Sequence, residues 1–428
     1  MARILALIFI FLLPSLGTLA RADPPGRVAR LNYAAGAVSF APAQAPEAWT
    51  QAVHNRPLSD GDRLWAGDTG RAELHIGSLA LRLAPLTSVD VLHLDDDIVQ
   101  LRLAQGALNV RVRELDAGEI IEIATPTGAV LLRQPGSYRV SIDPHSDVSR
   151  VLVHYGQAEV VTPFQTVTVP SSQLAEIPSG GGIGFEVVSQ ASMDEFDRWS
   201  AERDRREDRV ASARYVSRDM TGYEDLDTHG TWRTLPDYGA VWVPTRVASG
   251  WAPYRHGHWS WIAPWGWTWI DDAPWGFAPS HYGRWVWVNT YWAWAPGRLE
   301  RRPVYAPALV AFIGGSDFHV AIGSGPAVGW FPLGWGETYR PWYRASPTHV
   351  RRVNITHVAN ITHITNVNQY VYRNRREAVT VVPQQTFVSA RPVAQSSMNI
   401  SPAALSRAEI LRDRSPAEPG RASFAASR

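Results

Sequence analysis

The chain has 428 residues, no cysteine and a formal charge of +1, and all of its basic residues are arginine. The lack of cysteine excludes a disulfide framework, a thiolate metal site and a cysteine-linked lipid anchor. A chain of this length exceeds one ordinary core, so two or three domains are expected.

The N-terminus has the three regions of a secretory signal peptide. A short charged start precedes an apolar run from Ile4 to Leu16 and the small-residue motif Ala20-Arg21-Ala22. Residues 1–22 are therefore predicted to be a signal that is cleaved after Ala22. The apolar run is short for a membrane span, and no later stretch of about 18 uncharged apolar residues follows. The mature protein is expected to be periplasmic or secreted, without a transmembrane span.

Residues 23–178 alternate apolar and polar side chains in short segments. Examples are Leu79-Ala-Leu-Arg-Leu83 and Leu108-Asn-Val-Arg-Val112, in which every second side chain would face a core. Turn motifs such as Ser59-Asp-Gly61-Asp62 separate these segments. The pattern predicts an all-β domain, either a sandwich or a solenoid.

This domain resembles the FecR domain of periplasmic proteins from Gram-negative bacteria. The resemblance rests on Leu58-Ser-Asp-Gly61-Asp62, Leu101-Arg-Leu-Ala-Gln-Gly106, Ile123-Ala-Thr-Pro126 and Gly136-Ser-Tyr138. It implies an extracytoplasmic interaction or sensing module, and the best-known members relay a transporter signal to a cytoplasmic sigma factor. No internal transmembrane helix or cytoplasmic anti-sigma segment is recognisable here, so the resemblance implies a fold and a compartment more than a signalling role.

Residues 179–226 are predicted to form a Gly-rich linker and a charged amphipathic helix. Gly180-Gly-Gly-Ile-Gly184 indicates a flexible joint. Ser192-Met-Asp-Glu195 fits a capping box at the start of a helix that extends to about Arg214. The charges of this helix are most simply a solvated face with local ion pairs, and a partner-binding helix is the alternative.

Tryptophan is concentrated in one part of the chain. Sixteen of the nineteen tryptophans lie between Trp232 and Trp342, and they recur with Gly, Tyr and Pro every 26 to 27 residues. The copies begin at Gly230-Thr-Trp232, Gly257-His-Trp259 and Gly283-Arg-Trp285. A fixed period indicates one repeated supersecondary unit stacked on its neighbours. Residues 227–345 are therefore predicted to be a Trp-rich antiparallel β-repeat domain of three units.

The repeat region closely resembles a domain of unknown function that accompanies FecR-like domains in a set of uncharacterised secreted bacterial proteins. The matching motifs include Trp251-Ala-Pro-Tyr254, Trp275-Gly-Phe-Ala-Pro279 and Tyr339-Arg-Pro-Trp-Tyr343. The resemblance brings no known activity with it.

The tryptophans could build a core or bind a ligand. Alternate residues of a strand share one face, so the rings could stack into ladders that form the core. Sixteen indoles are nevertheless hard to bury within about 110 residues, and exposed rings could stack on sugars. Candidates for such ligand-binding rings, because they are extra to the repeat consensus, are Trp261, Trp265, Trp267 and Trp287.

Catalytic and metal sites have weaker support. Asp271-Asp272 offers the two carboxylates that a glycosidase needs, but adjacent strand residues point to opposite faces, so a turn is expected. His256 and His258 could share one side of a strand, yet no further ligand has a recognisable spacing. We therefore predict no catalytic residue, no metal and no cofactor.

The C-terminal part is predicted to be less regular. Residues 346–393 are expected to be an Asn/His/Thr-rich extended segment followed by terminal strands at Val379–Val382 and Phe387-Val388, and residues 394–428 a disordered basic tail. From Arg340 onward the chain contains thirteen arginines and only four acidic residues. This balance favours an anionic partner such as lipopolysaccharide, acidic glycan or nucleic acid, although a solvated tail is the simpler interpretation and specific nucleic-acid recognition is not predicted.

These observations predict a mostly β, non-enzymatic extracytoplasmic interaction protein whose aromatic repeat binds a protein partner or a cell-envelope glycan. One alternative is an envelope enzyme that acts on a polysaccharide. Another is an assembly factor for an envelope complex that uses the Arg-rich tail.

Overall fold

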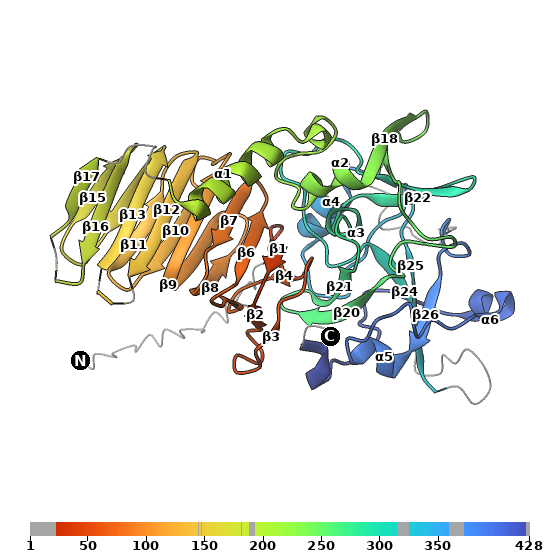
Figure 1. Ribbon diagram of the computed structural model, residues 1–428. Helices are drawn as coiled ribbons and strands as arrows, with labels where there is room; N and C mark the ends of the chain where they lie inside the picture. The colour runs from red at the N-terminus through yellow and green to blue at the C-terminus, as the bar shows by residue number, and fades with distance from the viewer. Residues whose placement is uncertain are drawn as a thin grey trace, which may run out of the picture.

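The computed structural model describes residues 23–143, 145–146, 148–180, 182–187, 193–314, 325–358 and 372–424. The protein is mostly β, with 40% strand against 14% helix, as predicted. The predicted signal peptide and residues 359–371 of the Asn/His/Thr-rich segment lie outside the described residues. Figure 1 shows a long β module beside a domain of mixed short sheets and helices.

The N-terminal module consists of two sheets that the chain visits alternately. One sheet has the order β4 (Pro57–Leu58), β1 (Ala29–Ala35), β6 (Arg71–Ile76), β7 (Leu79–Leu83), β9 (Ile98–Val112), β12 (Gly136–Asp143), β13 (Val148–Tyr155), β16 (Gln173–Pro178) and β17 (Gly184–Val187). The other has the order β3 (Thr50–Gln51), β2 (Val38–Ala41), β5 (Arg63–Ala66), β8 (Thr87–Leu94), β9, β10 (Ile120–Thr125), β11 (Gly128–Leu132), β14 (Gln157–Val161) and β15 (Thr166–Pro170).

Strand β9 belongs to both sheets. Its first half pairs with β8 and β10, and its second half pairs with β7 and β12. The change of sheet falls near Gly106, which has a φ of +89° and lies so close to Thr87 that a Cβ atom would approach its Oγ1 to 2.3 Å. Only glycine fits such a corner. The two sheets enclose one apolar core that includes Leu81, Leu101 and Val140.

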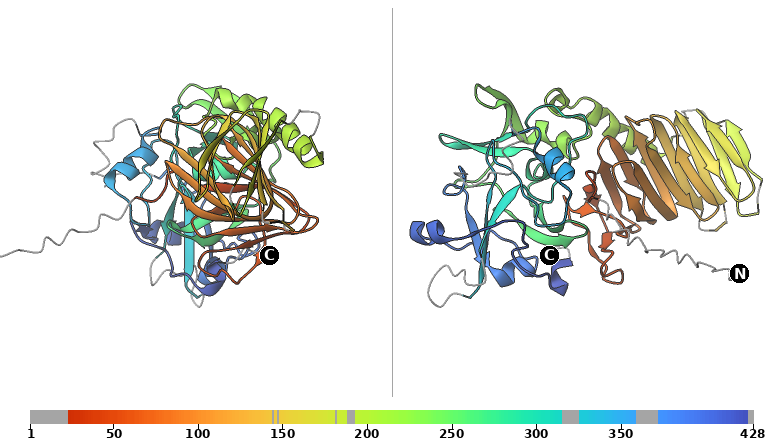
Figure 2. Two further views of the ribbon diagram at one scale, coloured as in Figure 1. Left: turned by 90° about the vertical axis from the view of Figure 1, so that its left-hand side faces the viewer. Right: turned by 180° about the vertical axis from the view of Figure 1, so that it is seen from behind.

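The predicted linker region contributes one more strand to the β module. Residues Gly184–Val187 form β17, which pairs antiparallel with β16. The domain therefore extends beyond the predicted boundary at residue 178, because the last glycine of the run begins a paired strand. Figures 1 and 2 place β17 at the end of the module farthest from the Trp-rich domain.

Helix α1 (Glu195–Asp208) lies along this module (Figure 1) and is shorter than predicted. Its N-cap is Asp194, whose side chain accepts from the backbone N–H of Asp197 at 2.8 Å, while the Asp197 carboxylate accepts from the Asp194 N–H at 3.3 Å. The capping box therefore begins at Asp194 and not at the predicted Ser192, which lies outside the described residues. The 3-10 turn η2 (Ala211–Arg214) follows the helix.

The charged face of α1 is buried only in part, so the prediction of a solvated face holds for residues such as Glu202 and Arg205 but not for Glu207. Glu207 is 6% exposed and lies 3.0 Å from the Arg113 guanidinium of β9. Glu73 on β6 accepts from Arg82 and from Arg203 of the helix, each at 2.5 Å. These charges of α1 therefore find partners across the module and not within the helix.

The Trp-rich domain contains three small sheets and several short helices. The first sheet has the order β18 (Gly230–Leu235), β19 (Gly239–Pro244), β23 (Tyr291–Ala295) and β22 (Arg284–Val288), and the second pairs β20 (Gly257–Ile262) with β21 (Gly266–Asp271). The third has the order β26 (Thr380–Pro383), β25 (Ala327–Pro332), β24 (Val310–Ile313) and β27 (Ile410–Leu411). The helical segments are η3 (Tyr223–Asp225), α2 (Leu226–His229), α3 (Phe277–His281), α4 (Pro347–Asn354), α5 (Gln384–Val388), α6 (Pro402–Arg407) and η5 (Arg421–Phe424).

The segment predicted to be a disordered tail packs on this domain up to residue 424. Leu411 of β27 pairs with Phe312 of β24. The indole N–H of Trp267 donates to the carbonyl of Ala417 at 2.8 Å, and Ser260 Oγ donates to the carbonyl of Ser423 at 2.9 Å. The prediction of disorder is wrong for these residues, because backbone carbonyls of the tail accept hydrogen bonds from side chains that are buried in the repeat.

The preceding segment is also more helical than predicted. Val353 and Asn354 end helix α4 and do not begin an extended run. The strand expected at Val379–Val382 is present as β26, whereas Phe387-Val388 belongs to helix α5. None of the helices in the described parts of the chain combines the length and apolar character that a membrane span requires.

The two domains share a buried polar interface. Arg30 of β1 contacts Glu224 at 2.9 Å and Asp225 at 2.6 Å, both in η3. Asn55 donates to the carbonyls of Asp271 and Ala273, at the end of β21, at 2.9 and 2.7 Å. Because buried polar groups are costly without partners, these contacts fix the β module against the Trp-rich domain.

Candidate binding site

Each sequence repeat is one β-hairpin. The hairpins are β18–β19, β20–β21 and β22–β23, and each sets a tryptophan of its first strand opposite a tryptophan of its second. These cross-strand pairs are Trp232 with Trp242, Trp259 with Trp269, and Trp285 with Trp294. The first and third hairpins share a sheet, whereas the second forms a separate two-stranded ribbon. The three units therefore do not form the continuous stack that the period predicted.

The glycine that opens each repeat makes room for the second tryptophan of its hairpin. A Cβ atom on Gly230 would lie 2.2 Å from the Trp242 ring, and one on Gly257 would lie 2.6 Å from the Trp269 ring. The same holds for Gly283 and Trp294, at 2.4 Å. The glycine of the repeated Gly-x-Trp motif thus leaves space for the indole that packs against it from the second strand.

The four tryptophans predicted to bind a ligand do not form one surface. Trp265 is 1% exposed and Trp267 is 0% exposed, so the surrounding core covers both rings and they cannot serve as exposed platforms. Trp261 is half-buried, with its ring edge-on to Trp267 at 5.5 Å. Trp287 is 41% exposed and lies on another hairpin, 5.1 Å from Trp292.

Asp271 and His258, which were considered for catalysis and metal binding, are both buried in the fold. Asp271 ends β21 and accepts from the Trp269 indole N–H at 2.9 Å and from the Ala273 backbone N–H at 3.0 Å. Burial raises the pKa of Asp271 to about 7. His258 is 3% exposed, and burial lowers its pKa to about 3. In the described part of the chain, no three acidic, histidine or cysteine side chains gather as a metal site would require.

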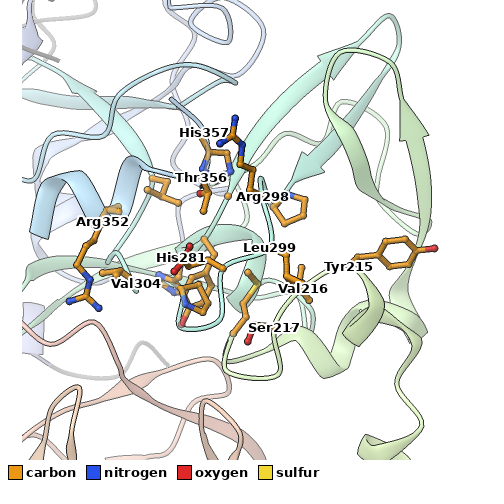
Figure 3. A pocket seen from close by; sticks show the side chains of 18 residues that line it. Tyr215, Val216, Ser217, His281, Arg298, Leu299, Val304, Arg352, Thr356 and His357 are labelled. Atoms are coloured by element: carbon orange, nitrogen blue, oxygen red, sulfur yellow. Dashed lines mark hydrogen bonds between the residues drawn. The ribbon is translucent and has the colours of Figure 1, made fainter. Parts of the chain in front are cut away.

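A small cavity lies between helix α4, the end of α3 and the loop after β23 (Figure 3). Its volume of about 30 Å³ suits a single water molecule. His281 and His357 line the cavity, and each ring contacts a backbone carbonyl, of Ala306 at 2.8 Å and of Ala295 at 3.2 Å. Figure 3 shows Arg352 and Tyr215 on opposite sides of this space. The cavity is too small for a sugar or a peptide.

A larger hollow of about 760 Å³ opens beside α4, and we call it the arginine groove. Its volume lies within the range of ligand pockets. The lining combines two aromatic rings, three guanidinium groups and several short polar and apolar side chains. The lining residues are Arg340, Pro341, Trp342, Tyr343, Arg344, Ala345, Pro347, Thr348, Val350, Arg351 and Asp413.

The Trp-rich core holds the aromatic part of the groove in place. Trp342 is half-buried, and its ring lies 4.9 Å from Phe312, 5.8 Å from Tyr339 and 6.3 Å from Trp259. Trp259 belongs to the second hairpin, so the repeat supports the groove without lining it. An indole fixed in this way can bind a ligand without losing side-chain freedom on binding.

Helix α4 positions the charged part of the groove. Ser346 caps the helix by accepting from the His349 backbone N–H at 3.1 Å, and its own N–H and Oγ donate to the Asp23 carboxylate at 2.6 Å each. This cap orders the turn that lies between Arg344 and Arg351. The tail contributes Asp413, which lies 3.5 Å from Arg340.

A second hollow of about 900 Å³ lies beside α6 and also contains arginines, among them Arg373 and Arg376. Arg375 in this hollow donates to the backbone carbonyls of Leu405 and Ala408. Its lining has no tryptophan. The arginine groove is therefore the better candidate for a ligand with flat apolar faces.

A protein-family model matches part of the chain. A family of unknown function, DUF6600, matches residues 223–337. The DUF6600 match begins in η3 and covers all three hairpins, but it ends before Arg340, so the arginine groove lies outside it. No curated protein matches the chain.

Two solved structures show limited similarity. They are crystal structures, at 2.50 and 1.65 Å resolution, of a protein from Parabacteroides distasonis ATCC 8503 that is provisionally described as an anti-sigma factor. The identities are 16% and 15%, each with a TM-score of 0.27, and each match covers 30% of this chain. The chain spans only 60% of the length of that protein.

The sequence did not single out the arginine groove. Two signals for it were present: the motif Tyr339-Arg-Pro-Trp-Tyr343 and the excess of arginine that follows. They pointed to different features, a family resemblance and a charged tail. Only the fold shows that Trp342, Arg351 and Asp413 line one hollow.

Proposed function

We propose that this protein is a non-catalytic, extracytoplasmic binding protein that holds a cell-envelope glycan in the arginine groove. The observation that carries this proposal is the half-buried Trp342, held by Phe312 and Trp259 at the side of an open hollow. Sugar rings have apolar C–H faces that pack on indole, and a rigid indole binds them at low entropic cost.

The acidic residues of the groove favour binding over catalysis. Glycosidases use two carboxyl groups within about 10 Å. Among the described lining residues the groove has one, Asp413, whose side chain is 59% exposed and lies beside Arg340. Asp271 is 8% exposed and bonded within its own turn, and it is not among the lining residues.

The N-terminal module supports an interaction role outside the cytoplasm. Its all-β fold is the fold class expected from the resemblance to a FecR domain, and the predicted signal peptide agrees with export. The buried contacts of Arg30 with Glu224 and Asp225 join this module to the Trp-rich domain. The module would therefore hold a fixed position relative to the domain that contains the groove.

A protein partner is the second candidate, and the far end of the β module favours it. Phe164, Phe185 and Val187 lie at this end, in or beside β15 and β17, with exposed fractions of 69%, 48% and 78%. Large apolar side chains that are exposed at the end of a module can mark a protein interface. Cross-linking in envelope extracts, with Phe185→Ser as the variant, would test this candidate.

The glycan proposal is tested by titrating the mature chain with peptidoglycan and with envelope polysaccharides. Calorimetry measures binding, and a reducing-end assay measures release of soluble sugar. We expect saturable binding without release, and weaker binding for Trp342→Ala than for Trp342→Phe. Trp287→Ala is the control, because Trp287 is an exposed ring on the third hairpin and does not line the groove. Release of sugar that disappears in Asp272→Asn would overturn the proposal in favour of an enzyme.

A further inference from the structure

We infer that the glycan bound in the arginine groove is acidic, with carboxylate or phosphate groups that pair with Arg344 and Arg351. This inference rests on the proposed function and names the class of ligand for the same site. It depends on the charges of the groove, whereas the proposed function depends on Trp342. The two can therefore fail separately.

The groove has more positive than negative charge. Its lining includes Arg340, Arg344 and Arg351 but only one carboxylate, Asp413, which lies beside Arg340. Arg344 and Arg351 are exposed, and neither has an ion-pair partner among the residues described. A concave site lined by one sign of charge attracts ligands of the opposite sign.

Two buried arginines of the N-terminal module have carboxylate partners. Arg113 contacts Glu207 at 3.0 Å and Asp208 at 2.9 Å, and Arg82 contacts Glu73 and Asp204 at 2.5 and 2.9 Å. These groups are neutralised where they stabilise the fold. The guanidinium groups of Arg344 and Arg351 are left without a carboxylate beside an aromatic hollow, which is where a ligand would supply it.

The shape of the site favours a glycan over other polyanions. Trp342 is half-buried inside a hollow, which a flat membrane surface would not reach. Nucleic acid combines phosphate with flat bases, but the signal peptide predicts a compartment outside the cytoplasm. A polymer of acidic sugars provides both features that the groove can bind: apolar ring faces for Trp342 and anionic groups for the two arginines.

The two guanidinium groups come from different positions along the chain. Arg344 precedes the cap residue Ser346, and Arg351 lies in the last turn of α4. A polymer with an anionic group on each sugar offers a partner to both arginines.

The test compares acidic and neutral polymers on the mature chain by calorimetry. Polygalacturonate supplies carboxylate groups and a phosphomannan supplies phosphate groups. Dextran is the neutral polymer, and single-stranded DNA is a polyanion that is not a glycan. We expect both acidic glycans to bind, with affinity that falls as salt is raised. Arg344→Glu/Arg351→Glu should weaken this binding by about tenfold or more. Arg205→Glu/Arg246→Glu makes the same charge change at exposed positions outside the groove and should leave it unchanged.

The remaining outcomes of this test would contradict either the inference, the proposed function or both. Dextran binding as tightly as the acidic glycans, with dependence on Trp342 alone, would overturn the inference and leave the proposed function intact. Single-stranded DNA binding as tightly, with the same arginine dependence, would overturn the choice of an acidic glycan. Failure of every glycan to bind would overturn both. Arg344→Gln/Arg351→Gln repeats the test without reversing charge, and circular dichroism confirms that each variant is folded.

Discussion

The Nδ1 atom of His75 lies 3.0 Å from Oε1 of Glu224, and this contact crosses from β6 of the N-terminal module to η3 of the Trp-rich domain. The other ring nitrogen lies 3.0 Å from Glu73. Burial alone would lower the pKa of His75, but the carboxylates of Glu207, Glu224 and Glu73 outweigh it and raise the pKa to about 10. A charged imidazole therefore links the two domains.

The first prediction concerns the loss of one carboxylate from this link. Glu224→Gln keeps the size of the side chain but leaves the cations Arg30 and His75 with less negative charge around them. Breaking a buried pair from one side costs about 3–5 kcal/mol, so we expect the free energy of unfolding to fall by about this amount. Urea denaturation followed by circular dichroism measures it.

Glu195→Gln is the matched control for that variant. The Glu195 carboxylate is also ion-paired, with Arg71 at 2.6 Å, but its side chain is 78% exposed. Exposed pairs contribute about 0–1 kcal/mol. Equal losses in the two variants would show that the buried network does not hold the domains together.

The second prediction is a pH dependence that His75 causes. Its pKa is about 10 in the folded protein, above its ordinary value of 6.5. The stabilisation from His75 should therefore be complete below pH 6.5 and should disappear as the pH rises through 10, because only the folded state keeps the proton in between. Unfolding free energies of the wild type and His75→Gln, measured from pH 6.5 to 10, should converge.

Glu207 is coupled to this titration. Burial raises its pKa and the charge of His75 lowers it, so the pH dependence belongs to the pair. A wild-type advantage that stays constant over the whole range would mean that His75 does not hold a proton in the folded protein.

The sequence predicted the strands and the repeat because their signals are local. Alternation in Leu79–Leu83 and Leu108–Val112 is a property of neighbouring residues, and both segments lie in strands of the N-terminal module. The Gly-x-Trp motif likewise marks the first strand of all three hairpins. Spacing alone could not show that the second hairpin lies outside the sheet that joins the other two.

The incorrect predictions concern contacts between residues far apart in the chain. The helix pattern alone predicts that Glu207 is solvated, but in the fold β9 places Arg113 beside it. The tail reads as disordered because it is rich in Ser, Ala, Pro and Arg, yet its carbonyls accept from Trp267 and Ser260 of the second hairpin. The composition of the tail shows how polar it is. It does not show that hydrogen-bond donors far away in the sequence need the backbone carbonyls of the tail as acceptors.

The third prediction tests the packing of tryptophan on glycine. Gly230 has a φ of −161°, which any residue adopts, so Gly230→Ala introduces only a clash with the Trp242 ring, 2.2 Å from the new Cβ atom. We expect a loss of about 1–3 kcal/mol in unfolding free energy, as for other overpacked cores. Gly180→Ala is the control, because a Cβ atom there meets nothing within 4 Å. A Gly230→Ala protein as stable as this control would show that the indole can move aside.

The last prediction concerns the C-terminal segment. Deleting residues 412–428 leaves β27 in place but removes the Ala417 carbonyl that accepts from the Trp267 indole N–H, together with Ser423 and its contact with Ser260. Each buried donor that loses its partner costs about 1–3 kcal/mol. We therefore expect a lower denaturation midpoint and a red shift of tryptophan emission as water reaches the second hairpin. Arg414→Ala, which removes only an exposed contact with Glu409, should change neither. If the truncated protein kept both the midpoint and the emission of the full chain, the tail would not be part of the folded domain.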